Sequence, residues 1–101
     1  MSEYILQILR TQLMVVFSWG FNSPMRLHDD RGLRFYVDGF KYQGAVEVIY
    51  NIGKDLFEVH LTDNGTIVED VYLDNLIQVV DGLVERTDDY LNRVKVEYKL
   101  I

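Results

Sequence analysis

Cysteine is absent from this chain of 101 residues, while proline occurs once and histidine twice. Without cysteine there can be no disulfide bond, thiolate metal site or cysteine nucleophile. The histidines, His28 and His60, lie far apart in the sequence and on different predicted elements, whereas a metal site gathers several ligands. We therefore interpret both as surface residues and predict neither a metal site nor a cofactor.

Recognisable catalytic motifs are also missing. Ser18 and Ser23 stand outside any Gly-x-Ser-x-Gly elbow. Neighbouring acids form three pairs, Asp29-Asp30, Glu69-Asp70 and Asp88-Asp89. Adjacent acids point apart, whereas glycosidase chemistry needs two carboxyl groups that face each other across a cleft. The sequence therefore predicts no catalytic residue and a protein that is not an enzyme.

Basic residues are in the minority, because ten Lys and Arg stand against sixteen Asp and Glu and give a formal net charge of −6. Proteins that bind nucleic acid or an anionic membrane surface present basic residues to the phosphates. The charge therefore argues against direct nucleic-acid binding and against membrane association.

A long uninterrupted apolar run is lacking as well. Residues 4–21 are rich in apolar side chains, but polar residues at positions 7 and 10–12 interrupt them. A membrane span needs ~20 mostly apolar residues, and Glu3 differs from the basic start of a secretory signal. We predict instead one buried helix over about Glu3–Ser18, with Ser2 as its N-cap and Gly20 as its stop. Its apolar face is so wide that we expect it to be covered from more than one side, by the sheet and by another helix or a second subunit.

Period-two alternation of apolar and polar residues runs through residues 33–71. The apolar positions form three sets, Leu33, Phe35 and Val37, then Val46, Val48 and Tyr50, then Phe57, Val59 and Leu61. This pattern predicts an antiparallel sheet with one buried and one solvated face. We expect strands at about 33–40, 45–51, 56–62 and 66–70, preceded by a loop over 22–32. The last is expected to be an edge strand that Glu69 and Asp70 protect from pairing.

The register of the first hairpin stays open. A two-residue turn at Asp38-Gly39 would place Phe35 opposite Tyr42. A four-residue turn over 41–44 would place Phe35 opposite Tyr50, and we favour it because it gives strands of matched length.

The C-terminal third is predicted to be helical. Apolar residues at helical spacing predict a helix over about 73–86, in which Gly82 is interpreted as allowing another backbone to approach closely. Residues 87–101 fit either a helix to about residue 97 or a strand, and the helix is favoured.

These elements predict a single α+β domain over residues 1–101. Its two layers are an antiparallel meander of three or four strands and, on one face of it, the N-terminal helix and the C-terminal helices. The order along the chain is one helix, four strands and two helices.

Aromatic residues gather around the first hairpin and the end of the first helix. Such residues are enriched in protein interfaces, but they are also large core residues, so both interpretations stay open for Trp19 and Phe21. Tyr36 is expected on the solvated face beside Arg34. The candidate partner contacts are Trp19, Phe21, Arg34, Tyr36 and Tyr42.

Three segments together resemble a group of short uncharacterised bacterial proteins, some of them associated with mobile elements. The segments are Leu9-Arg10-Thr11-Gln12-Leu13-Met14-Val15-Val16, Leu33-Arg34-Phe35-Tyr36-Val37-Asp38-Gly39-Phe40 and Val84-Glu85-Arg86-Thr87-Asp88-Asp89-Tyr90. The resemblance implies a bacterial, cytoplasmic setting and no activity or catalytic residues.

Three functional hypotheses follow. The leading one is a non-catalytic module that binds another protein or a second copy of itself. The second is an acidic decoy that imitates the charge of DNA. The third is a small ligand-binding domain or enzyme with a pocket between sheet and helices that holds tyrosines and His28.

Overall fold

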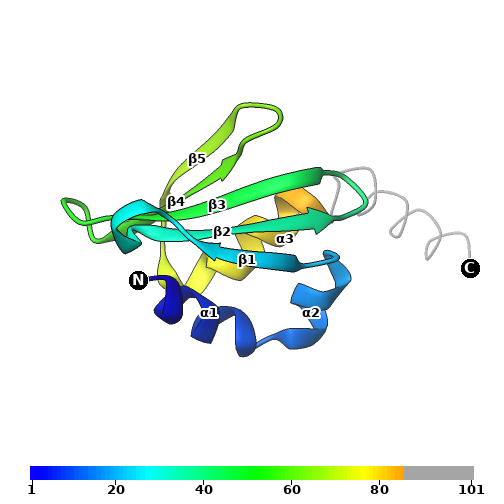
Figure 1. The fold of residues 1–101 in the computed structure, drawn as a ribbon, viewed down its shortest axis with the longest axis horizontal. Coiled ribbons are helices and arrows are strands. Elements are labelled where there is room, and N and C mark those ends of the chain that lie inside the picture. Colours follow the sequence, from blue (N-terminus) through cyan, green and yellow to red (C-terminus); the bar gives the residue numbers. More distant parts are fainter. Residues whose placement is uncertain (86–101) are drawn as a thin grey trace, which may run out of the picture.

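A five-stranded antiparallel sheet with helices on one face makes up the structure, a computed structural model that describes residues 1–85 (Figure 1). The helices are α1 (Ser2–Arg10), α2 (Leu13–Ser18) and α3 (Leu76–Val84), and short 3-10 turns span His28–Asp30 and Leu73–Asn75. The strands are β1 (Asn22–Arg26), β2 (Gly32–Asp38), β3 (Gln43–Asn51), β4 (Leu56–Leu61) and β5 (Thr66–Val71). They pair in sequence order as a meander, which confirms the predicted α+β fold.

The buried face of the sheet is the one that the period-two pattern predicts. Phe57, Val59 and Leu61 of β4 are 4%, 0% and 3% exposed. In the neighbouring strand Val46 and Val48 are also fully buried, and they pair with Leu61 and Val59. Because one face of the sheet is apolar, the helices from both ends of the chain pack against it.

The predicted single N-terminal helix is two helices, which corrects the sequence prediction. At the break Gln12 leaves the helical region, with φ −138° and ψ 62°. The Thr11 hydroxyl donates to the carbonyl of Ile8 at 2.6 Å, a side-chain bond that competes with continuation of a helix. Ser2 lies inside α1 and is not its cap. Gly20, with φ +69°, does end α2 as predicted.

The segment expected to be a loop contains a fifth strand. β1 pairs with the outer edge of β2, with an irregularity between Asn22 and Met25, where Ser23 has a positive φ of 54°. Pro24 lacks an N–H group and is tolerated only where no ladder bond is needed, as on an edge strand. All five residues of β1 are exposed, so neither alternation nor propensity marks this strand in the sequence.

Both predicted registers of the first hairpin are wrong. Phe35 pairs with Val46, and Asp38 pairs with Gln43, so that residues 39–42 form the turn. The end of α3 holds this turn, because the carbonyl of Val84 accepts from the N–H groups of Lys41 and Tyr42 at 2.7 and 3.2 Å. The register therefore depends on a contact between parts of the chain more than 40 residues apart.

The later elements lie close to their predicted positions. β4 and β5 match the expected strands to within one residue, and β5 is an edge of the sheet, with Glu69 and Asp70 exposed. The predicted second helix begins as a 3-10 turn and continues as α3. The prediction for residues 87–101 lies outside the described residues. In the described part of the chain no helix combines the length and apolar character that crossing a bilayer requires.

Candidate functional site

Trp19, one of the five predicted contact residues, lies in the core. It is 0% exposed, and its ring stacks on that of Phe35 with the ring centroids 6.5 Å apart. The indole Nε1 donates to Asp81 Oδ1 of α3 at 2.9 Å, which satisfies the one polar group of the side chain. Trp19 thereby joins the N-terminal helices to α3, and this packing accounts for its presence.

Phe21 and Tyr42 also serve the packing of the chain. The ring of Phe21 lies 4.8 Å from that of Phe35. Tyr42 is 6% exposed, and its hydroxyl donates to the carbonyl of Ala45 at 2.6 Å and accepts from the N–H of Asp63 at 3.1 Å. The structure therefore does not bring the five predicted residues together on one surface.

Arg34 and Tyr36 do lie on the open face of the sheet, as predicted. The Arg34 guanidinium is 3.2 Å from Glu47 Oε2 and donates to the Tyr36 hydroxyl at 3.3 Å. Glu47 pairs across the strands with His60, whose Nε2 lies 3.0 Å from Glu58 Oε1. These five side chains form a polar row across β2, β3 and β4.

The polar row is internally paired. Hydrogen bonds from His60 and Asn51 lower the pKa of the Glu58 carboxyl below its usual value, and the bond from His60 has the larger effect. The charges of Arg34 and Glu47 also form an ion pair. Among residues 1–85 no group of three or more His, Asp and Glu is placed to hold a metal ion. The row is therefore a set of contacts within and between strands, of which the cross-strand ones, Arg34 with Glu47 and Asn51 with Glu58, stabilise the sheet.

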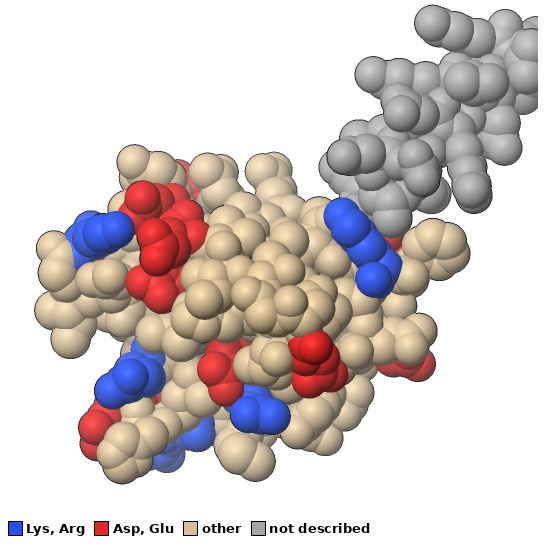
Figure 2. Space-filling view, turned by 90° about the horizontal axis from the view of Figure 1, so that it is seen from above, with Lys and Arg blue, Asp and Glu red and all other residues tan. Residues whose placement is uncertain are grey.

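Charge on the side of the molecule opposite α1 and α2 is mixed. Figure 2 shows acidic groups interspersed with lysine and arginine rather than joined in one band. Lys54 and Asp70, for example, form an ion pair in which Nζ and Oδ1 are 3.1 Å apart. A mimic of DNA needs acids in an extended stripe, and this side of the molecule gives that hypothesis no support.

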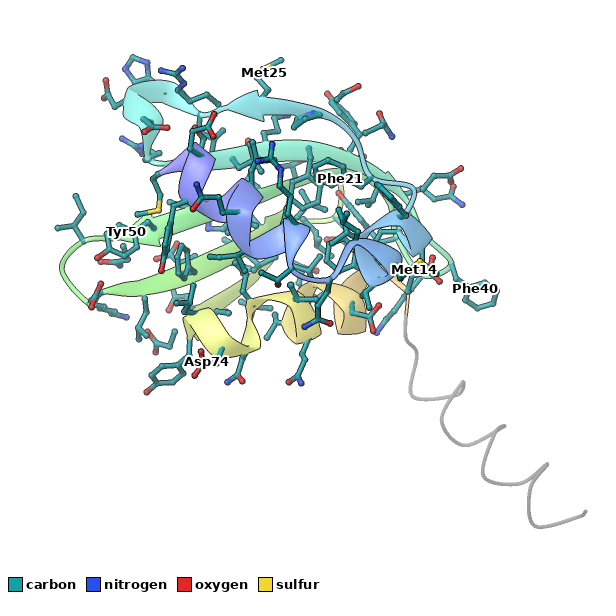
Figure 3. The ribbon with its side chains drawn as sticks, turned by 90° about the horizontal axis from the view of Figure 1, so that it is seen from below. Met14, Phe21, Met25, Phe40, Tyr50 and Asp74 are labelled. Carbon is teal, nitrogen blue, oxygen red and sulfur yellow. The ribbon has the colours of Figure 1, made fainter. Side chains whose placement is uncertain are left out.

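The largest exposed apolar side chains of the helical layer belong to α2. Met14 is 85% exposed and Phe17 64%, and Leu13, the first residue of the helix, is 46% exposed. Phe40, in the β2–β3 turn, is 73% exposed and lies toward the same end of the molecule as Met14 (Figure 3). We call these four residues the α2 surface.

The architecture explains why these side chains are not buried. α2 has six residues and turns Val16 fully and Val15 partly into the core, so Leu13, Met14 and Phe17 point outward. Phe40 is held in place because its N–H donates to Glu85 Oε1 at 3.0 Å, at the end of α3. No charged residue occurs between Arg10 and Arg26. α2 therefore presents an apolar face with no charged residue of its own, whereas Phe40 lies beside Glu85 and Lys41.

Sequence reasoning missed this surface, although its signal was present. The apolar face of the N-terminal segment is too wide for one covering layer. A continuous helix over 3–18 would have distributed the uncovered apolar side chains along its length. The break at Thr11–Gln12 concentrates these side chains on α2 instead.

No protein-family model matches this chain, and no match is found among curated proteins or among solved structures. The function is therefore argued from the surfaces of the chain itself.

Proposed function

We propose that the protein is a non-catalytic interaction module that associates with a second copy of itself through the α2 surface. The observation that carries the proposal is the exposure of Leu13, Met14 and Phe17 on one short helix, at the end of the molecule toward which Phe40 also lies (Figure 3). Clustered exposed apolar side chains of this size mark interaction sites, since burying them releases their contact with water.

A second copy is the occupant that the charge distribution favours. Two chains that each carry −6 repel each other, and they approach most easily where acids are sparse, as they are over α2. Residues 11–25 carry no charged side chain. A twofold axis through α2 would set the same apolar residues of the two copies against each other, as in the commonest class of homo-oligomer.

The experiment is sedimentation velocity on the full chain over a wide concentration range. We expect a monomer–dimer equilibrium for the native sequence. Phe17→Glu places a charge in the contact and should weaken association by at least about 30-fold. A native chain that stays monomeric at every concentration overturns the proposal, and so does a Phe17→Glu variant that dimerises as strongly as the native chain.

Ile52→Glu is the matched control. Ile52 is 83% exposed and lies in the turn between β3 and β4, at the end of the molecule away from α2 (Figure 1). The substitution introduces the same charge on another exposed apolar residue. We expect it to leave the dimer intact, so equal weakening by both variants would show a general charge effect and contradict the proposed contact. The bacterial, cytoplasmic setting that the resemblance implies stays a prediction.

A further inference from the structure

A cavity of about 410 Å³ lies at the end of the molecule remote from the α2 surface. Its size falls in the roughly 300–1,000 Å³ range of small-molecule sites. Three tyrosines from separate parts of the chain line it, namely Tyr4 of α1, Tyr50 of β3 and Tyr72 between β5 and α3. We call it the tyrosine pocket, and Figure 3 shows Tyr50 and Asp74 at this end.

The aromatic walls are anchored and yet open to solvent. The Tyr50 hydroxyl donates to Asp55 Oδ1, and its ring lies 5.5 Å from the ring of Phe57. Tyr4 and Tyr72 are 44% and 60% exposed. Aromatic surface from three tyrosines is therefore available around one hollow, whereas single exposed aromatic residues elsewhere on a surface surround none.

The charge in the tyrosine pocket is negative. Asp55 and Asp74 belong to its lining, and among residues 1–85 no Lys or Arg side chain does. The ammonium group of Met1, which also lines it, is already paired with the carboxylate of Asp30. Lys54, in the turn beside Asp55, is engaged with Asp70 at 3.1 Å. A ligand that enters the pocket therefore meets uncompensated carboxylates.

Two physical facts select the class of ligand. The face of an aromatic ring is negative and attracts a cation that lies over it. Phe57 and Leu73 add apolar lining, against which methyl groups pack better than the strongly hydrated N–H groups of a primary ammonium. An alkylated ammonium spreads its charge over methyl groups and loses less hydration on entry.

We propose that the tyrosine pocket binds an alkylated ammonium group, with the rings of Tyr4, Tyr50 and Tyr72 against its methyl groups and Asp55 and Asp74 providing the opposite charge. This inference is independent of self-association, because the tyrosine pocket and the α2 surface lie at different ends of the molecule (Figure 3).

Calorimetric titration of the full chain with choline tests the proposal. The control ligand is 3,3-dimethylbutan-1-ol, which has the same shape without the charge. We expect saturable binding of choline and at least about tenfold weaker binding of the alcohol, since only choline gains from the rings and the carboxylates. No saturable binding of choline, or equal binding of the two ligands, overturns the proposal.

Two variants locate the binding. Tyr72→Leu and Asp74→Asn change exposed residues, so the fold should survive them, which circular dichroism can verify. Each should weaken choline binding by about three- to tenfold. Tyr36→Leu makes the same change as Tyr72→Leu on the open face of the sheet and should leave choline binding unchanged. Binding that Tyr72→Leu and Asp74→Asn leave unaffected overturns the assignment to this pocket.

The alkylated ammonium could belong to a free small molecule or to a methylated lysine in a peptide. A short peptide that contains trimethyllysine, compared with its unmodified form and with choline, separates these sources. Tighter binding of the trimethylated peptide than of choline assigns the group to a protein side chain. Binding no tighter than that of choline assigns it to a free organic cation.

Discussion

At the residue scale, two glycines show that the surroundings of a Cα atom decide what an added methyl group does. A Cβ atom on Gly39 would lie 2.4 Å from Val84 Cγ1 and 2.5 Å from the Val84 carbonyl oxygen. A Cβ atom on Gly82 would meet nothing within 4 Å among the described residues. The close backbone approach that the sequence suggested for Gly82 therefore occurs at Gly39 instead.

Opposite effects of the same substitution are expected at these positions. Gly82→Ala should raise the free energy of unfolding by about 0.5–1 kcal/mol, because alanine favours the helix and has room. Gly39→Ala should lower it by about 1–3 kcal/mol, because α3 must move away from the turn. Urea denaturation of both variants measures the two effects, and a stable Gly39→Ala variant would contradict the observed docking of α3.

Trp19 and Tyr42 show what residue type alone leaves open. Both have large apolar rings with one polar group, which suits a core as well as an interface. Each is buried here because its polar group finds a partner distant in the sequence, Asp81 for Trp19 and the Asp63 N–H for Tyr42. Such partners are set by the fold, so the sequence could place these residues only as candidates.

At the scale of elements, one hydroxyl group links two turns of the meander. The Tyr42 hydroxyl, at the β2–β3 turn, donates to Ala45 and accepts from the N–H of Asp63, which follows β4. The Ala45 carbonyl also accepts from the N–H of Thr62 at 3.2 Å. The backbone N–H of Asp63 therefore loses its acceptor if the Tyr42 hydroxyl is removed.

Tyr42→Phe should lower the free energy of unfolding by about 1–3 kcal/mol, because a part-buried N–H loses its acceptor. Tyr36→Phe is the matched control, since within residues 1–85 the Tyr36 hydroxyl bonds only Arg34, at the surface, and its effect should stay within about 0.5 kcal/mol. Thermal or urea unfolding provides the comparison. Equal stability of the Tyr42→Phe variant and the native chain would show that this link between the turns is not needed.

The elements themselves differ in how far the sequence could predict them. β4, β5 and α3 follow from alternation, from turn residues such as Asp55 and Gly65 with their positive φ, and from helical spacing. The exposed edge strand β1 has no apolar face and could not be recognised in this way. The break before α2 and the register of the β2–β3 hairpin depend on local hydrogen bonds and on Val84, which no periodicity reveals.

At the scale of the whole molecule, the acidic charge is unevenly distributed. Residues 1–85 hold thirteen Asp and Glu and six Lys and Arg, a net charge of −7, while residues 11–25 within them hold none. Two copies that meet through the α2 surface keep their acids apart, but the remaining charge still repels over the distance of the Debye length.

Salt should therefore strengthen the proposed self-association. Between about 0.1 M and about 1 M sodium chloride the Debye length falls from ~10 to ~3 Å, which screens the repulsion, while apolar contact is retained. We expect the dimer dissociation constant to fall by about threefold or more in sedimentation experiments. Dissociation promoted by salt would indicate a contact made of ion pairs, and so a surface other than α2.

The sequence by itself determined the fold class and the side of the sheet that is buried, because alternation with period two leaves each strand only one apolar face. It also determined where the later strands and α3 lie. Tertiary structure alone decided the hairpin register, the burial of Trp19 and Tyr42, the exposure of the α2 surface and the assembly of the tyrosine pocket. Apart from the local break before α2, these features depend on residues distant along the chain, such as Tyr4, Tyr50 and Tyr72 around one pocket, and only folding brings such residues to one place.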